Sequence, residues 1–292
     1  MKFRSLSPLR YPGGKARLAA YLARLIAAQD PRPREYAEPF AGGAGAALRL
    51  LETEEVHAIH LNDLSPAIAA FWRSVFGRTD EFAARIINQE ITIDAWREAR
   101  EVYLAPDEAS DFELGYATFL LNRFNRSGIL EAGPIGGMEQ KGNWKIGARF
   151  NAAELAGRVA YVGEYRNRVH LSQLDARDFV AHLERTAPDT LLYVDPPYLV
   201  QGERLYLDSL SYTDHKELAA QLIASSLPWF LTYDADERIT EDLYQGMRCI
   251  EFGISHTAHT QHQGAEYAVF GPNLTVPGID VISRQTSHWI AS

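Results

Sequence analysis

The hydrophobic and polar positions of the first 77 residues alternate between helical periodicity and short apolar runs. Apolar residues recur at helical spacing over 15–28, 43–52 and 65–76. Short apolar runs of strand type lie between these segments, at 35–40 and 56–61. This alternation of strand and helix predicts a mostly parallel sheet covered by helices, an α/β fold.

The alternation stops after the third helix. Three further helical patterns follow without a buried strand, at 79–89, 93–104 and 111–124. Residues 125–151 then hold many glycines and cations but little apolar periodicity, which is typical of a functional or disordered excursion. We therefore predict an inserted helical and loop-rich subdomain over 70–165, and one domain built from 1–69 and 166–292.

The sheet pattern resumes in the last third of the chain. Strands are predicted at 168–173, 190–194, 228–233, 247–254 and 265–271, and helices at 176–184, 214–226 and 236–244. Asp214 and Glu217 have the spacing of a capping box and predict the start of the second of these helices.

Composition is that of an ordinary globular protein. The chain has 292 residues with 46% hydrophobic content and one cysteine, Cys249, which excludes an intramolecular disulfide framework. No apolar run approaches the roughly 20 residues of a membrane-spanning helix, and the N-terminal residues lack the apolar centre of a signal peptide. We expect a cytoplasmic protein that contacts no membrane.

The formal net charge of −9 argues against a nucleic-acid-binding protein when taken as an average. Basic residues nevertheless gather in the first 34 positions and again between Arg123 and Arg149, with few acids among them. Such local patches could bind phosphates, although scattered solvated charges are an equal alternative on composition alone.

Residues 36–46, "YAEPFAGGAGA", read as a strand, a glycine turn and a helix start. Glycines let the backbone approach a ligand, and Asp63 stands about twenty residues on, where an acid can bind ribose hydroxyls. The Gly-x-Gly-x-x-Gly order and the phosphate-binding lysine of a P-loop are absent. A nucleoside ligand without pyrophosphate fits better, and S-adenosylmethionine is one; a simple tight turn is the alternative.

A second turn, "RYPGGK" at residues 10–15, places Lys15 at the start of a helix. A cation is unfavourable towards the helix dipole there, so Lys15 indicates an anionic partner such as a substrate carboxylate. A surface lysine after a turn is the other reading.

The stretch "LLYVDPPY" at residues 191–198 ends a buried apolar strand with an acid, two prolines and a ring. Asp195 could accept a hydrogen bond from an exocyclic amine and stabilise the positive charge that develops on methylation. The rigid Pro196 carbonyl could accept from the other amine hydrogen, and Tyr198 could stack on the base. An ordinary strand end with an Asp-Pro turn is the alternative.

A base inside a duplex reaches such a pocket only when it is turned out of the stack, which requires a DNA-binding element. The excursion supplies cations for phosphates, amides for base edges and the ring of Trp144 as a wedge. The predicted DNA-binding residues are Arg123, Asn125, Arg126, Lys141, Asn143, Lys145 and Arg149.

Together these motifs resemble the Dam-like DNA adenine methyltransferase family. The segments "RYPGGK", "EPFAGGAG", "LND", "NRFNRSGI" and "DPPY" occur in the order typical of that family, between residue 10 and about 270. The resemblance implies a Rossmann-like S-adenosylmethionine-dependent methyltransferase sheet with an inserted target-recognition subdomain. It implies methylation of the adenine 6-amino group in a specific double-stranded DNA sequence.

The resemblance also implies roles for single residues. Asp195, Pro196, Pro197 and Tyr198 would form the catalytic pocket. The S-adenosylmethionine site would comprise Tyr11, Gly14, Lys15, Glu38, Phe40, Gly42, Asp63, Asp178, Phe179 and Asp195. The recognition segment departs from that of members reading GATC, so no target sequence can be transferred.

Several alternatives stay open. The same fold could methylate another amine, such as adenine in RNA or cytosine in DNA, or could be an inactive DNA-binding relative. A monomer is favoured, with restriction or defence components as possible partners. His256, His259 and His262 lie three residues apart, yet no fourth ligand is evident and no metal is needed for a sulfonium donor, so no metal site is predicted.

Overall fold

A computed structural model describes the residues 5–10, 15–199, 210–255, 263–280, 282 and 287–291. The chain divides into two compact units. We call the first the helical unit; it comprises Met1–Ala16, Gly42–Arg49 and Asp63–Gln173. The second is the sheet unit, which comprises Arg17–Ala41, Leu50–Asn62 and Leu174–Ser292.

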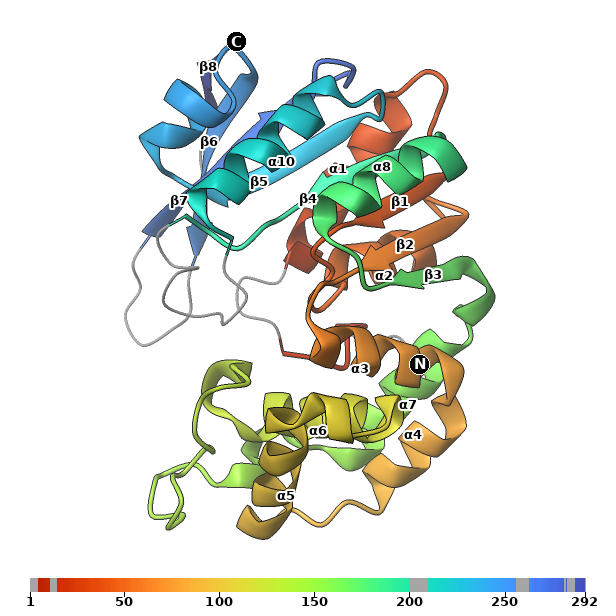
Figure 1. Cartoon of the computed structure of the whole chain (residues 1–292), viewed down its shortest axis with the longest axis vertical. Helices are drawn as coiled ribbons and strands as arrows, with labels where there is room; N and C mark the ends of the chain where they lie inside the picture. The colour runs from red at the N-terminus through yellow and green to blue at the C-terminus, as the bar shows by residue number, and fades with distance from the viewer. Residues whose placement is uncertain are drawn as a thin grey trace. The chain divides into compact units, whose positions relative to one another are not determined.

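The strands of the sheet unit form a mixed sheet (Figure 1). They are β1 (Glu35–Glu38), β2 (Ala58–Asn62), β4 (Thr190–Val194), β5 (Trp229–Asp234), β6 (Arg248–Ser255), β7 (Gln263–Phe270) and β8 (Ser287–Ala291). Their spatial order is β2-β1-β4-β5-β7-β6-β8. The pairs from β2 to β5 are parallel and those from β5 to β8 are antiparallel, which confirms the predicted α/β class.

Helices cover both faces of this sheet. On one face, α8 (Ala176–Thr186) and α10 (Tyr212–Ala224) lie side by side (Figure 1) and share a core with Leu192 and Val194 of β4. On the other face, Tyr21 of α1 (Ala19–Ala28) contacts the ring of Phe230, with 5.7 Å between ring centroids. Burial on both faces explains why the central strands are continuously apolar rather than alternating.

The strand order reverses between β1 and β4. The chain runs from β1 to β2 on one side and later adds β4 and β5 on the other side of β1. Ligands of open α/β sheets bind outside the carboxyl ends of the strands at such a reversal. Glu38 ends β1 there, and Asp195 directly follows β4.

Five helices dominate the helical unit. They are α3 (Pro66–Gly77), α4 (Thr79–Ile87), α5 (Ile93–Leu104), α6 (Asp111–Phe124) and α7 (Ala152–Gly163). Rings of Phe71, Phe82 and Phe119 fill their shared core, with 5.5 Å between the centroids of Phe82 and Phe119. Gly115 lets α3 and α6 approach, because a Cβ at this position would lie 2.5 Å from the carbonyl oxygen of Ala70.

Shorter elements complete the described chain. They are η1 (Lys15–Leu18), α2 (Gly45–Glu52), η2 (Pro106–Glu108), η3 (Arg126–Gly128), η4 (Ile146–Arg149), η5 (Arg166–Arg168), β3 (Val169–Ser172) and the π-helical turn η6 (Ile239–Leu243). None of the helices within the described ranges is long and apolar enough to cross a membrane.

One predicted helix cap differs in the structure. The helix α10 begins at Tyr212, and its capping box pairs Ser211 with Asp214 rather than Asp214 with Glu217. Ser211 precedes the apolar pattern from which the prediction was made, so its hydroxyl was overlooked. The helix predicted at 236–244 is present over residues 237–243, and its η6 part (Ile239–Leu243) is π-helical.

Two elements were not foreseen. The helix α7 follows the excursion directly, with Asn151 as its N-cap, and its apolar residues Leu155, Val159 and Val162 are buried. The strand β8 pairs with β6 at the sheet edge, where three of its five residues are exposed and an apolar pattern is lacking. The predicted absence of a strand from residues 78–165 is confirmed, since this fully described stretch holds only helices, turns and one isolated bridge.

Candidate active site

Asp195 stands at the carboxyl end of β4, where two prolines end the strand. All five residues of β4 are buried, whereas Asp195 is half-buried. Neither Pro196 nor Pro197 can donate to a neighbouring strand, so the backbone leaves the sheet at this point. The Asp195 Oδ1 atom accepts a hydrogen bond of 2.8 Å from the Thr232 hydroxyl of β5.

The ring of Tyr198 is held from β7. Its hydroxyl donates to Glu266 Oε1 at 2.6 Å, and Glu266 is only 3% exposed. Burial raises the pKa of the Tyr198 phenol far above its ordinary range, and the charges of Asp195 and Glu266 raise it further. Tyr198 therefore stays a neutral donor, with its ring fixed at one end by a buried carboxylate.

Acidic side chains from several strands share one face of the sheet. The register places Asp195 beside Thr232 and places Asp234 opposite Glu266. On β1, the Glu38 carboxylate accepts a hydrogen bond of 2.9 Å from the Tyr36 hydroxyl. Burial, followed by the charges of Asp195, Glu266 and Glu38, raises the pKa of Tyr193. This face therefore offers hydrogen-bond acceptors and a field that favours positive charge.

Asn62 is a supporting residue that the sequence prediction missed. It is fully buried in the sheet unit, and its amide donates to Pro39 O at 3.0 Å and Leu174 O at 2.9 Å. Its backbone carbonyl accepts from Ala41 N at 2.8 Å. Asn62 thus holds the turn after β1 and the approach to α8. Asn62 stands in the segment "LND" at the end of an apolar strand, but that segment was interpreted through Asp63 alone.

In the helical unit, Asp63 organises the glycine turn. Its two carboxylate oxygens accept from Gly42 N at 2.9 Å and from Ser65 N at 3.1 Å. Gly42 has a positive φ of 44°, which glycine adopts readily, and its carbonyl accepts from Trp72 Nε1 at 2.9 Å. These two backbone hydrogen bonds fix the orientation of the Asp63 carboxylate beside the turn.

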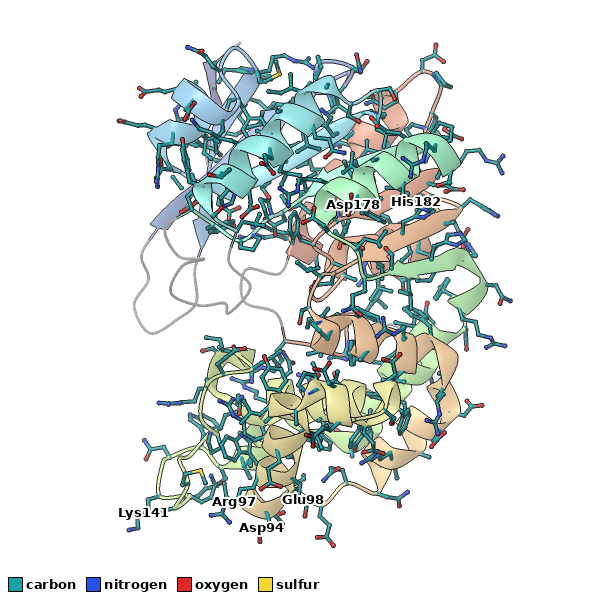
Figure 2. All side chains as sticks on the ribbon, in the orientation of Figure 1. Asp94, Arg97, Glu98, Lys141, Asp178 and His182 are labelled. Carbon is teal, nitrogen blue, oxygen red and sulfur yellow. The ribbon has the colours of Figure 1, made fainter. Side chains whose placement is uncertain are left out.

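The remaining predicted cofactor residues occupy different environments. Lys15 is buried in η1, and Phe40 is half-buried against the core of the sheet unit. Figure 2 labels Asp178 on α8, where it is exposed, while Phe179 is buried in the core beside Val180. Tyr11 and Gly14 lie outside the described residues.

The excursion carries most of the predicted DNA-binding residues on its surface. Arg126, Lys141, Asn143, Lys145 and Arg149 are all exposed, and Trp144 is 73% exposed. Lys141 projects from the loop in Figure 2 and pairs with Glu139 at 2.5 Å.

Gln140 holds this loop in shape. Its side chain donates to Ile135 O at 2.8 Å and accepts from Ile146 N at 2.8 Å. Its backbone carbonyl accepts from Lys145 Nζ at 2.5 Å. The exposed cations and ring are thus presented from an internally bonded loop.

Asn125 has a different use from the one expected. It is 0% exposed; its amide donates to Ile129 O at 2.9 Å and Leu130 O at 2.8 Å, and its Oδ1 accepts from Trp96 Nε1 at 2.6 Å. Asn125 therefore anchors the start of the loop, and its side chain makes these hydrogen bonds inside the protein.

Arg123 is buried among other arginines. It is 6% exposed, and its Nε has no acceptor among the described residues. Burial lowers its pKa to about 9, and the charges of Arg158, Arg10 and Arg149 act in the same direction. Arg158 pairs with Glu154, so this cluster carries an excess of positive charge on the helical unit.

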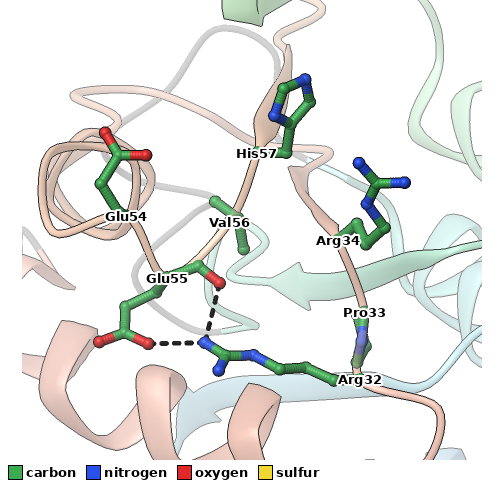
Figure 3. Close-up of a pocket in the computed structure, with 7 residues that line it drawn as sticks. All are labelled: Arg32, Pro33, Arg34, Glu54, Glu55, Val56 and His57. Atoms are coloured by element: carbon green, nitrogen blue, oxygen red, sulfur yellow. Dashed lines mark hydrogen bonds and ion pairs between the residues drawn. The ribbon is translucent and has the colours of Figure 1, made fainter.

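One surface depression of about 310 Å³ lies elsewhere on the sheet unit (Figure 3). Its lining comes from residues 32–34, which precede β1, and from residues 54–57, which precede β2. It therefore sits at the amino ends of these strands, opposite the edge that carries Glu38 and Asp195. Arg32 and Glu55 pair across it at 2.8 Å, and no chemistry is indicated there.

His256, His259 and His262 lie outside the described residues. Their role stays unassigned.

The comparison with known families gives one match. Residues 11–261 match the D12 class N6 adenine-specific DNA methyltransferases. No curated protein matched the chain. The matched range includes both the glycine turn and the strand that ends at Asp195, and it covers well over half of the sequence. The chain therefore belongs to the D12 class N6 adenine-specific DNA methyltransferase family and is an enzyme.

Proposed function

We propose that the enzyme transfers a methyl group from S-adenosylmethionine to the 6-amino nitrogen of an adenine turned out of double-stranded DNA at a specific sequence. The observation that supports this proposal is the fixed position of the Asp195 carboxylate. Asp195 lies where the strand order reverses, and it accepts a hydrogen bond from Thr232. The same short turn carries Tyr198, whose ring is fixed by Glu266.

Methylation of this amine requires hydrogen-bond acceptors from the protein rather than a protein nucleophile. The lone pair of the adenine amine is delocalised into the ring, and positive charge develops on this nitrogen during the attack. Asp195 would accept a hydrogen bond from the amine, and the Pro196 carbonyl would accept the other. The neutral ring of Tyr198 would stack on the base. As the nitrogen attacks the methyl carbon, the bond from this carbon to sulfur breaks and S-adenosylhomocysteine leaves. The nitrogen then loses a proton to solvent, which gives neutral N6-methyladenine.

S-adenosylmethionine supplies a methyl group already activated on a sulfonium. Asp63 suits the ribose, because two backbone N–H groups fix its carboxylate beside the glycine turn, and an acid at this position can bind ribose hydroxyls. The bend at Gly42 allows close backbone approach to a ligand. We assign Glu38, Phe40, Lys15, Asp178, Phe179, Tyr11 and Gly14 to this ligand as well, by resemblance to the family.

Residues 70–165 would recognise DNA. The exposed cations of the excursion suit phosphates, and Trp144 suits a wedge that enters the space left by the departed base. A flipped base is required because the amine of a paired adenine cannot reach a carboxylate at a strand end.

The test is incubation with S-adenosylmethionine labelled on its methyl group and with DNA, RNA and protein as separate acceptors. Label should enter DNA alone, and hydrolysis of that DNA should yield N6-methyladenine. Heat-treated enzyme provides the background. Label confined to RNA, or recovered as a methylated cytosine, would contradict the proposal.

Sequencing that detects methylation, on DNA from cells expressing the chain, would then give the recognition sequence. A single motif should be methylated throughout, whereas methylation without a motif would contradict site specificity.

A further inference from the structure

Asp195 lies at the end of a chain of buried hydroxyl groups. The Thr232 hydroxyl donates to Asp195 Oδ1 at 2.8 Å, and the Tyr193 hydroxyl lies 2.8 Å from the same Thr232 oxygen. Thr232 is 0% exposed, and Tyr193 is buried beside it. These three side chains come from two adjacent parallel strands, β4 and β5.

The direction of the two hydrogen bonds follows from counting hydrogens. A threonine hydroxyl has one hydrogen, and Thr232 uses it to donate to the carboxylate. Its oxygen must therefore accept from the Tyr193 hydroxyl. The chain runs from Tyr193 to Thr232 to Asp195, and each bond polarises the next, which strengthens the donor that reaches the carboxylate.

The backbone register leaves little freedom in this arrangement. Val194 pairs with Leu231, so the next residues along, Asp195 and Thr232, lie beside each other with side chains on the same face. Tyr193 reaches Thr232 from the same face, and its ring stacks on Phe230 at 5.7 Å between centroids. The aromatic stack fixes the phenol, and the phenol fixes the threonine hydroxyl.

Valine would fill the position of Thr232 at similar volume without a polar group to desolvate. A buried hydroxyl costs free energy unless its hydrogen bonds are made, so the threonine is explained by what it bonds. Its two hydrogen bonds join the Tyr193 hydroxyl to the Asp195 carboxylate that follows β4.

We propose that Thr232, backed by Tyr193, is the positioning residue that orients the Asp195 carboxylate towards the adenine amine. The role rests on the proposed function, because it assumes that Asp195 accepts from that amine. Thr232 itself touches no reacting atom.

The test compares Thr232→Val, which removes the hydroxyl at nearly constant volume, with Thr232→Ser, which keeps it. The Thr232→Val variant should lose about 10- to 100-fold in kcat, the effect of one lost charge-assisted hydrogen bond. Its KM for DNA and Kd for S-adenosylmethionine should stay within about twofold of the wild-type values, since the lost bond acts on the reacting geometry. Thr232→Ser should restore kcat to within about threefold, because the donor is retained.

Tyr193→Phe tests the far end of the chain without changing Thr232. It removes only the donor behind the threonine, so kcat should fall by about three- to tenfold. Thermal unfolding of each variant reports whether the fold survives. If Thr232→Val does not fold, an unchanged kcat in Tyr193→Phe overturns the proposal.

Two other results would also overturn it. One is wild-type kcat in Thr232→Val; the other is equal loss in Thr232→Ser and Thr232→Val, which would mean that packing of the methyl group matters. Failure of the proposed function gives a different result, because the wild-type enzyme itself would then transfer no methyl group to DNA adenine.

Discussion

The carboxyl edge of the sheet unit and the basic excursion of the helical unit use polar residues in opposite ways. At the sheet edge, Asp195 and Tyr198 are held by the buried partners Thr232 and Glu266. On the excursion, Lys141 and Arg149 are exposed to solvent. Chemistry on a single amine requires acceptors fixed in place before the substrate arrives. Phosphate binding requires charge that can adapt to the backbone of DNA.

The largest expected effect is at the sheet edge. Asp195→Ala should lower kcat by about 10³-fold or more, because the acceptor for the amine is lost and no other group replaces it. The Kd for S-adenosylmethionine, measured by calorimetry, should change little. Glu241→Ala is a suitable comparison, since it removes an exposed acid of the same unit on η6 that has no part in the proposed site. Wild-type turnover in Asp195→Ala would refute the assigned role.

A smaller effect is expected when the exposed cations are neutralised together. The triple variant Lys141→Gln, Lys145→Gln and Arg149→Gln should weaken DNA binding by about 100-fold at physiological salt. The slope of log K against log salt should become shallower by about 2 to 3, because each phosphate contact contributes about 0.9. An unchanged slope in fluorescence anisotropy titrations would place the DNA on another surface.

The smallest expected effect on DNA binding comes from replacing one buried cation, Arg123. Arg123→Met should weaken DNA binding by about tenfold, because the basic cluster that Arg123 forms with Arg158 and Arg10 loses one positive charge. Its thermal stability should not fall, because methionine carries no charge to desolvate beside Arg158 and Arg10.

Arg97→Met is the matched control for Arg123→Met. Arg97 is exposed on α5 of the same unit and pairs with Asp94 (Figure 2). It should alter DNA affinity by less than about twofold. Equal losses in both variants would show that the effect reflects overall charge rather than the buried site.

Secondary structure was predicted best where periodicity was strong. The strands at 190–194 and 228–233 and the helix at 176–184 agree with β4, β5 and α8. The capping box of α10 was placed three residues late, because Ser211 acts through one hydroxyl outside the apolar pattern. The strand β8 was missed because an edge strand exposes much of its surface and shows no alternation.

The same limit applies to the candidate site. Asp195 and Tyr198 could be singled out because four unusual residues stand together at a strand end. Thr232 and Glu266 could not, since each is a lone polar residue inside an apolar strand tens of residues away. Arg123 and Asn125 were predicted as contact residues from their type, and their burial was invisible in the sequence.

The sequence by itself determined the strand and helix alternation, the glycine turn with its acid, and the Asp-Pro-Pro-Tyr end of β4. Each of these features depends only on residues a few positions apart, because periodicity and turn chemistry are local properties of the chain. Only the tertiary structure decided which side chains hold Asp195 and Tyr198. Those partners come from β5 and β7, and the register between strands, which no local pattern encodes, brings them within hydrogen-bonding distance.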